Sequence, residues 1–266
     1  MNNDKLLDIR KLSVHYHNNG NITKAVENID LSIQRGETVG LVGESGCGKS
    51  SLALAILRLI DPPGKIYGEI KWKGMNLLNL SSTEMQEVRG GDIAMVFQDP
   101  FSALNPVFKV GEQIAEIFRI RQDISKKQAW DRAVELIDMM HIKDPAQRAN
   151  DYPHQFSGGM KQRVAVAMAY ALRPDLLIAD EPTTALDVTM QKSILELIKG
   201  LKTTILFISH NIALVSELCS RVCVMQAGRI VEQGNTIDVI KDPKDAYTAK
   251  LVNSCREINL DINRDQ

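Results

Sequence analysis

The chain has 266 residues, of which 44% are hydrophobic, so it can bury the core of one large domain or of a domain with a subdomain. Its 32 basic and 33 acidic residues leave a net charge of -1 without a long run of one sign, which argues against nucleic-acid binding. The longest apolar stretches, at 52–60 and 164–172, are too short to cross a bilayer, and the first ten residues lack the apolar core of a secretory signal. We therefore expect a cytosolic protein.

The sequence predicts two kinds of strand. Residues 6–16 and 25–33 alternate apolar with polar side chains and lead to Gly36, which favours a half-exposed antiparallel layer. Near-continuous apolar runs follow, as expected for strands buried on both faces of a mainly parallel sheet, at 38–42, 93–97, 176–179, 204–209 and 221–225. The predicted fold is α/β, a mainly parallel sheet with an N-terminal antiparallel β subdomain.

The stretch from about 99 to 156 carries no strand signal. Prolines interrupt it at 100, 106, 145 and 153, and Ser125-x-x-Gln128 is a capping-box pattern that opens a helix with an apolar face. We therefore predict a helical subdomain inserted between core segments 6–98 and 157–250. The tail at 251–266 turns polar after Val252, and we expect it to be frayed.

Residues 43–50, GESGCGKS, match the phosphate-loop pattern GxxxxGK(S/T), follow an apolar strand and precede a helical run at 51–60 that Asp61-Pro62-Pro63 stops. Such a loop curls so that its N–H groups converge on phosphates, while the lysine reaches the β and γ oxygens and the serine hydroxyl can bind magnesium. A chance glycine turn is the alternative. The predicted nucleotide-binding residues here are Gly43, Glu44, Ser45, Gly46, Cys47, Gly48, Lys49, Ser50 and Ser51.

Cys47 lies inside this loop. Oriented N–H dipoles should lower the pKa of its thiol, so that a thiol reagent labels it and ATP protects it. It could equally be a small buried apolar residue. The other cysteines, Cys219, Cys223 and Cys255, form no CxxC pair with it or with one another, so we expect a reducing compartment and no structural metal or disulfide.

A second anion site is predicted at 156–163, FSGGMKQR. Ser157, Gly158 and Gly159 open an apolar helical stretch, and free N–H groups at a helix start favour negative charge. This site and the phosphate loop are more than a hundred positions apart, which raises the question of whether both contact the same nucleotide.

Polar side chains follow three of the predicted buried strands. Asp180 and Glu181 follow the strand at 176–179, where Asp180 can hold magnesium and Glu181 can deprotonate the attacking water. A helix N-cap or a solvated acid is the alternative for either. His210, after 204–209, could contact a γ-phosphate or position Glu181, and Gln98, after 93–97, could ligate magnesium or place water.

In this order the motifs resemble the nucleotide-binding subunit of an ATP-binding-cassette (ABC) transporter, over residues 6–250, which implies a P-loop (RecA-like) α/β core. The resemblance makes Tyr16 the adenine-stacking aromatic, places Gln98 in the Q-loop, makes FSGGMKQR the signature, and makes Ala185-Leu186-Asp187 the D-loop. In that family the signature of one subunit completes the ATP site of another. Ser157, Gly158 and Gly159 would then act across a dimer that closes on ATP, and Asp187 of the D-loop would also be a nucleotide-binding residue. Met160 replaces the usual glutamine of the signature.

Finer motifs are similar to the oligopeptide, dipeptide and nickel importer branch: VFQDPFSALNP at 96–106, ADEPTTALDVT at 179–189, AGRIVEQG at 227–234 and the weaker PKDAYTAKL at 243–251. This implies ATP and Mg²⁺ as cofactors, a second ABC ATPase subunit, two transmembrane permease subunits, and indirectly an extracytoplasmic binding protein. It also implies a place on the cytoplasmic face of the membrane. Only Cys255 stands where many such importers carry a cysteine cluster, so no iron–sulfur cluster is expected.

Other classes fit less well. A soluble, non-transport ABC ATPase would need a long coiled coil or a second cassette, which this sequence does not contain. A P-loop kinase or GTPase would lack FSGGM, and a GTPase would carry an NKxD motif. The cargo, whether peptide, nickel or another metal complex, stays open.

Overall fold

The computed structural model describes residues 5–18, 21–99, 103–184 and 186–262. They form two compact units, one made of Met1–Met85 with Thr204–Gln266, the other of Gln86–Thr203. None of the helices in these described ranges is both long and apolar enough to traverse a bilayer.

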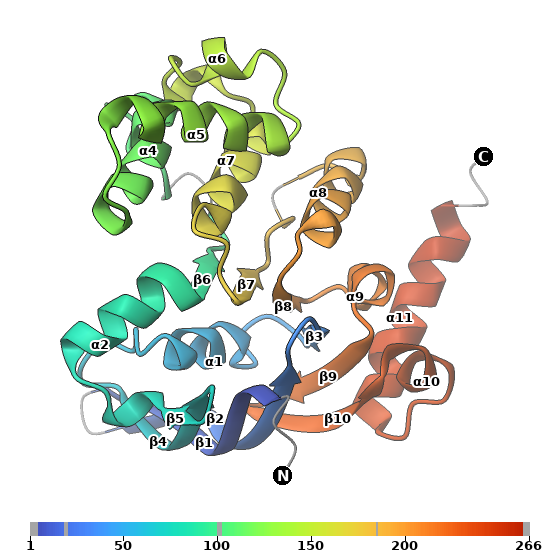
Figure 1. The fold of residues 1–266 in the computed structure, drawn as a ribbon. Coiled ribbons are helices and arrows are strands. Elements are labelled where there is room, and N and C mark those ends of the chain that lie inside the picture. The colour runs from blue at the N-terminus through green and yellow to red at the C-terminus, as the bar shows by residue number, and fades with distance from the viewer. Residues whose placement is uncertain (1–4, 19–20, 100–102, 185, 263–266) are drawn as a thin grey trace. The chain divides into compact units, whose positions relative to one another are not determined.

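The first unit is mostly β-structure (Figure 1). Its elements are β1 (Lys5–Asn18), β2 (Asn21–Gln34), β3 (Thr38–Val42), α1 (Lys49–Ile56), β4 (Lys65–Trp72), β5 (Met75–Asn76), β8 (Thr204–Ser209), α9 (Ile212–Leu218), β9 (Arg221–Gln226), β10 (Arg229–Asn235), α10 (Thr236–Lys241) and α11 (Ala246–Ile262). The helix α2 (Ser82–Glu87) lies where the two units join in sequence.

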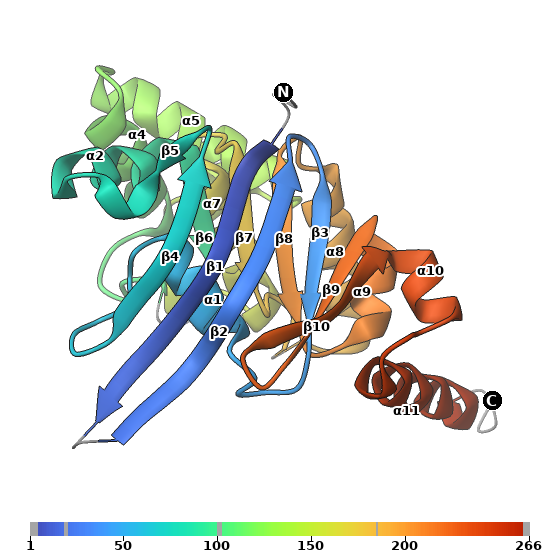
Figure 2. The ribbon, with the colours of Figure 1, turned by 90° about the horizontal axis from the view of Figure 1, so that it is seen from below.

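The predicted antiparallel layer is present, in the order β2-β1-β4-β5, with its long strands side by side in Figure 2. Lys11 bulges from β1 with φ 47°, so the inward alternation resumes at Leu12 after Ile9. The Lys11 N–H donates to Asp30 Oδ1 at 2.9 Å. A side chain at Gly68 on β4 would place its Cβ 2.5 Å from the Lys11 oxygen, so glycine is required opposite the bulge.

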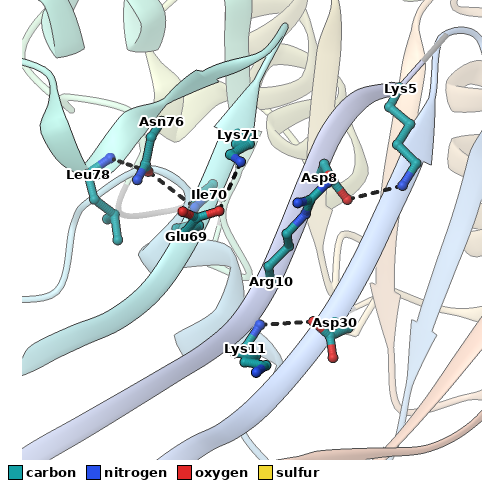
Figure 3. A network of polar contacts seen from close by, with 10 residues as sticks. All are labelled: Lys5, Asp8, Arg10, Lys11, Asp30, Glu69, Ile70, Lys71, Asn76 and Leu78. Carbon is teal, nitrogen blue, oxygen red and sulfur yellow. Dashed lines mark hydrogen bonds and ion pairs between the residues drawn. The ribbon is translucent and has the colours of Figure 1, made fainter. Parts of the chain in front are cut away.

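The outer face of this sheet is polar, with Asp8 paired to Lys5 and Arg10, and Glu69 paired to Lys71 (Figure 3). Such exposed pairs contribute little to stability but keep the face soluble. The strand β4 was not predicted, because its polar side chains and Gly68 weaken the strand pattern.

The remaining strands of the first unit are parallel except at one end. β3 pairs in parallel with both β8 and β9, and β10 pairs antiparallel with β9. The predicted strands at 38–42 and 204–209 have the bounds that the structure gives them. α9 packs on β3 at Gly40, where a Cβ would lie 2.3 Å from Val215 Cγ1.

One ion pair joins the start of β9 to the turn before β3. Arg221 Nε lies 2.7 Å from Glu37 Oε1, and the Arg221 guanidinium also donates to the Ser32 oxygen. Burial works to raise the pKa of Glu37, but hydrogen bonds from Arg221 and from the Gln34 N–H outweigh it, so the pKa is lowered. The ionised form of Glu37 is therefore favoured by folding.

We predict that Glu37→Gln lowers the free energy of unfolding at pH 7 by ~1–3 kcal/mol, as expected for a hydrogen-bonded charge. A lowered folded pKa gives stability that is present above the unfolded value, about 4.3, and is lost as pH falls through the folded value. Urea unfolding of both proteins should therefore converge at acid pH. Glu27→Gln, at a more exposed pair with Arg229, is the matched control and should change less. A difference that persists unchanged below pH 3 would contradict this role.

The second unit is mostly helical, around one parallel pair of strands. Its elements are β6 (Ile93–Val96), α4 (Val110–Arg121), α5 (Lys126–Met139), α6 (Pro145–Arg148), α7 (Gly158–Tyr170), β7 (Leu176–Asp180) and α8 (Val188–Gly200). β6 and β7 are parallel, α4 packs on α5, and α7 packs on α4, α5, α8 and β6. The capping box is present at Ser125 and Gln128, where α5 begins.

Two predicted element ends are wrong. α1 stops at Ile56 rather than at 60, because Arg58 adopts a left-handed conformation with φ 51° before the prolines are reached. The tail predicted to be frayed continues as α11 to Ile262. Residues 253–262 are of mixed polarity, with Ile258, Leu260 and Ile262 among polar side chains, and contain neither proline nor glycine, so nothing in them interrupts the helix.

Candidate functional site

The loop at 43–48 joins β3 to α1 and has the backbone of a phosphate cradle. Gly46 and Gly48 have φ of 80° and 106°, which favours glycine. A Cβ at Gly43 would lie 2.1 Å from the Met225 oxygen, and one at Gly48 would lie 2.1 Å from the Ala25 oxygen. A Cβ at Gly46 would meet nothing within 4 Å, so this side of the loop is open.

Lys49 crosses the inside of this loop. Its side chain is 4% exposed, and Nζ donates to the Gly43 oxygen at 2.8 Å and to the Glu44 oxygen at 3.0 Å. The first N–H groups of α1 have no acceptor within the helix and add positive potential. A buried ammonium beside these groups and an open glycine face suits a phosphate chain. The loop residues exposed to solvent are Glu44, Ser45, Gly46 and Ser50.

The first unit also brings two other predicted residues to this loop. Tyr16 of β1 donates from Oη to Ser51 Oγ at 3.3 Å, so the predicted adenine-stacking ring lies beside α1. His210 is exposed and directly follows Ser209, which pairs with Val42. Because Gly43 follows Val42, His210 and the phosphate loop leave neighbouring strands at the same sheet edge.

The β9–β10 hairpin contacts the phosphate loop through hydrogen bonds of its turn, a contact that was not predicted. The turn Ala227-Gly228 joins β9 to β10, and the Gly228 N–H donates to the Cys47 oxygen at 2.9 Å. The Gly228 oxygen accepts from the Glu27 N–H at 2.8 Å. The backbone of this turn therefore links β2 to the phosphate loop.

We predict that Gly228→Ala raises the KM for ATP by about 2- to 10-fold, as expected when one backbone hydrogen bond is weakened. Gly228 has φ 81°, and an added Cβ would lie 3.0 Å from the Ala25 oxygen. Gly74→Ala is the matched control, because Gly74 occupies the same place in a second two-residue turn, has φ 86° and has open space around its Cβ. Both variants should lose ~1–2 kcal/mol of stability from the left-handed backbone. If Gly228→Ala and Gly74→Ala have the same KM for ATP, Gly228 has no role in nucleotide binding.

The expectation for the Cys47 thiol is wrong. Burial raises the pKa of Cys47, and the attraction of Lys49 does not compensate, although Nζ lies 3.9 Å from Sγ. Cys47 is only 8% exposed, so the loss of hydration outweighs the loop dipoles that the sequence analysis emphasised. This agrees with the alternative of a small buried apolar residue.

We therefore predict that iodoacetamide at pH 7 labels the half-buried Cys255 before Cys47. Peptide mass spectrometry over a time course measures both rates in one sample. Labelling of Cys47 should slow further when ATP covers the loop. Faster labelling of Cys47 than of Cys255 would show that its thiol is activated after all.

In the second unit, Asp180 and Glu181 stand at the end of β7 and are 4% and 8% exposed. Val96 of β6 pairs with Ala179, so Gln98 and Asp180 leave neighbouring strands at one edge. Glu181 has φ 46°, and its Oε2 accepts a hydrogen bond from Thr184 Oγ1 at 2.7 Å. Thr184 was not among the predicted site residues, although it stands only three positions after the candidate base.

The remaining predicted residues begin helices of the same unit. Ser157 Oγ accepts from the Met160 N–H at 3.3 Å and caps α7, while Asp187 Oδ1 accepts from the Met190 N–H at 3.0 Å and caps α8. A Cβ at Gly159 would lie 1.8 Å from Met190 Cε, so these two helix starts lie in contact. A Cβ at Gly158 would meet nothing within 4 Å, which leaves the start of α7 open to an anion. Ala185 lies outside the described residues.

The predicted metal ligands are a hydroxyl, an amide and a carboxylate, those of Ser50, Gln98 and Asp180. Oxygen donors suit Mg²⁺, which keeps several waters and binds substrate phosphates together with one or two protein groups. The described ranges contain no group of three His, Cys, Asp or Glu side chains that could hold a metal. Each of these donors, taken by itself, thus fits a magnesium ion carried by a nucleotide.

The chain matches a protein-family model described as ABC transporter over residues 26–184. It is 49% identical to a probable peptide ABC transporter ATP-binding protein of Sinorhizobium fredii, over 94% of this chain and 77% of that protein. It is 48% identical to the oligopeptide transport ATP-binding protein OppD of Bacillus subtilis, over 94% and 72%. It is 47% identical to the dipeptide transport ATP-binding protein DppD of Haemophilus influenzae, over 95% and 78%.

Solved structures agree with this fold. The ATP-binding cassette MJ0796, in a dimeric post-hydrolysis state bound to ADP and phosphate, has a TM-score of 0.77 and 28% identity over 86% of this chain and 98% of its own. CbiO1 of Clostridium perfringens, part of the ABC transporter complex cbiONQ, has the same TM-score and identity over 98% and 97%. The predicted α/β fold with an N-terminal antiparallel layer is that of ABC ATPase cassettes.

Proposed function

Because the chain belongs to the ABC transporter family, whose ATP-binding cassettes hydrolyse ATP to drive transport, we propose that it powers the import of peptides. The observation that carries the peptide assignment is 47–49% identity, over nearly the whole chain, to relatives named for peptide, oligopeptide and dipeptide transport. The preorganised ammonium of Lys49 supports the same site for ATP in this chain.

In this proposal the first unit binds the nucleotide. Tyr16 stacks on the adenine, and Lys49 with the N–H groups of the loop holds the phosphates. The Ser50 hydroxyl of this unit would hold Mg²⁺, which would supply charge neutralisation on the phosphate oxygens when bound. Gln98 and Asp180 are the metal ligands that the sequence predicts for the second unit.

The second unit contributes the proton acceptor. Glu181 takes a proton from the attacking water, and the Thr184 hydroxyl keeps its carboxylate in one orientation. His210 of the first unit contacts the γ-phosphate of the ATP bound there. These roles follow from the resemblance and from the positions of the residues at strand ends.

The open helix start at Ser157 to Gly159, together with Asp187, serves the ATP bound to a second ATPase subunit, so closing of a dimer is part of the cycle. Two transmembrane permease subunits complete the assembly, which places the chain on the cytoplasmic face of the membrane. An extracytoplasmic binding protein delivers the cargo.

Uptake in a deletion strain tests the proposal. Labelled dipeptide uptake should be lost and restored by the wild-type gene but not by Glu181→Gln, while labelled nickel uptake is unchanged. Loss of nickel uptake alone would replace peptide by nickel as the cargo. If neither uptake changes and no permease copurifies from solubilised membranes, the chain is a soluble non-transport ATPase and the proposal fails.

A further inference from the structure

The C-terminal motif PKDAYTAKL has no part in the proposed reaction, yet it contacts the phosphate loop. Tyr247, in the first turn of α11, accepts a hydrogen bond at Oη from the backbone N–H of Glu44, with an N–O distance of 2.9 Å. The two residues are 203 positions apart in the chain. Tyr247 is 8% exposed, so water competes little for this bond.

Tyr247 is itself held from β10. Glu232 accepts hydrogen bonds from the N–H groups of Lys244 and Asp245 at 2.9 and 3.1 Å. Asp245 Oδ1 in turn accepts from the N–H of Tyr247 at 2.8 Å at the start of α11. The phenol therefore reaches the loop from a fixed base, because each link between it and the strand is a hydrogen bond to backbone.

The bond matters because of the peptide unit it holds. The N–H of Glu44 and the C=O of Gly43 belong to one planar group, so they turn together. The Gly43 oxygen accepts from Lys49 Nζ at 2.8 Å, and the Glu44 N–H donates to Tyr247. A rotation that broke one bond would misdirect the other. The side-chain contact of Glu44 with Lys250, at 4.0 Å and largely exposed, adds little.

We propose that Tyr247 is a positioning residue for ATP binding: through the peptide between Gly43 and Glu44 it fixes the Lys49 ammonium, so α11 sets the nucleotide affinity of the phosphate loop. The inference rests on the proposed role of Lys49 at the ATP phosphates. It gives the motif at 243–251 a function in the site that the family resemblance alone did not supply.

The test removes only the hydroxyl group of Tyr247 and keeps its ring. Tyr247→Phe should raise the KM for ATP and the Kd of a fluorescent ATP analogue by about 2- to 12-fold, the value of one net hydrogen bond. kcat at saturating ATP should change less than twofold. Tyr67→Phe, on an exposed ring of β4 in the same unit, is the matched control and should leave KM, Kd and kcat unchanged. A loss of thermal stability with unchanged Kd would reduce Tyr247 to a packing role and overturn the inference.

A double variant separates this inference from the proposed function. If Tyr247 acts through Lys49, adding Tyr247→Phe to Lys49→Ala should weaken analogue binding no further. Fully additive losses would overturn the inference while leaving the phosphate loop assigned. Unchanged binding in Lys49→Ala alone would instead overturn the proposed site itself.

Discussion

Glu181→Gln should lower the ATPase rate by ~10²–10⁴-fold, the usual contribution of a positioned general base. The amide keeps the size of the side chain and can still meet the Thr184 hydroxyl, which lies 2.7 Å from Oε2, but it cannot take a proton from water. ATP binding is expected to persist, because Glu181 directly follows β7 and is not part of the phosphate loop. The variant should therefore accumulate with ATP bound and its dimer closed.

Phosphate release gives the rate, and size-exclusion chromatography with ATP gives the closed dimer. Glu196→Gln, on the exposed side of α8 in the same unit, is the matched control and should hydrolyse ATP at the wild-type rate. A Glu181→Gln protein that retains full activity would remove Glu181 from the reaction and leave the assignment of the base without support.

Lys49→Ala should act at the earlier step and weaken ATP binding about 10- to 150-fold, equivalent to the ~1.5–3 kcal/mol of a hydrogen bond to a charged group. The side chain is almost fully buried and its Nζ is already directed by two loop carbonyls, so no other lysine can replace it. Turnover should fall mainly because the site is empty at ordinary ATP concentrations.

Titration of a fluorescent ATP analogue without magnesium measures this affinity with hydrolysis suppressed. Lys65→Ala, an exposed lysine on β4, controls for the loss of one positive charge from the same unit. Thermal unfolding without nucleotide checks that the loop variant is folded. If the folded Lys49→Ala protein binds the ATP analogue with wild-type affinity, the assignment of the phosphate loop is wrong.

The sequence was most predictive where a local pattern determines the backbone. The runs at 38–42 and 204–209 are strands with these bounds, and the box at Ser125 begins α5, because burial periodicity and capping act over a few residues. Contacts between distant segments could not be predicted in this way. Neither the bond from Glu44 to Tyr247 nor the support of Cys47 by Gly228 has a local signal, since each joins segments about 180 to 200 residues apart.

The burial of side chains was the other property that could not be predicted, and it explains the wrong prediction for the Cys47 thiol. The pKa of Cys47 depends on how much water the folded chain removes from the thiol, which a motif does not express. The roles of Glu181, His210, Gln98 and the signature residues stay predictions. These predicted roles depend on each residue standing at the end of a strand or the start of a helix, and local sequence patterns can predict such positions.

The left-handed backbone of Glu181, with φ 46°, has a consequence for how this position can vary. A glutamate there costs about 1–3 kcal/mol relative to a relaxed conformation, and glycine or asparagine would escape much of it. Random mutation selected only for thermal resistance would therefore tend to discard this carboxylate. In the proposed reaction this position exchanges stability for turnover, and a variant stabilised there by glycine or asparagine is expected to lose ATPase activity.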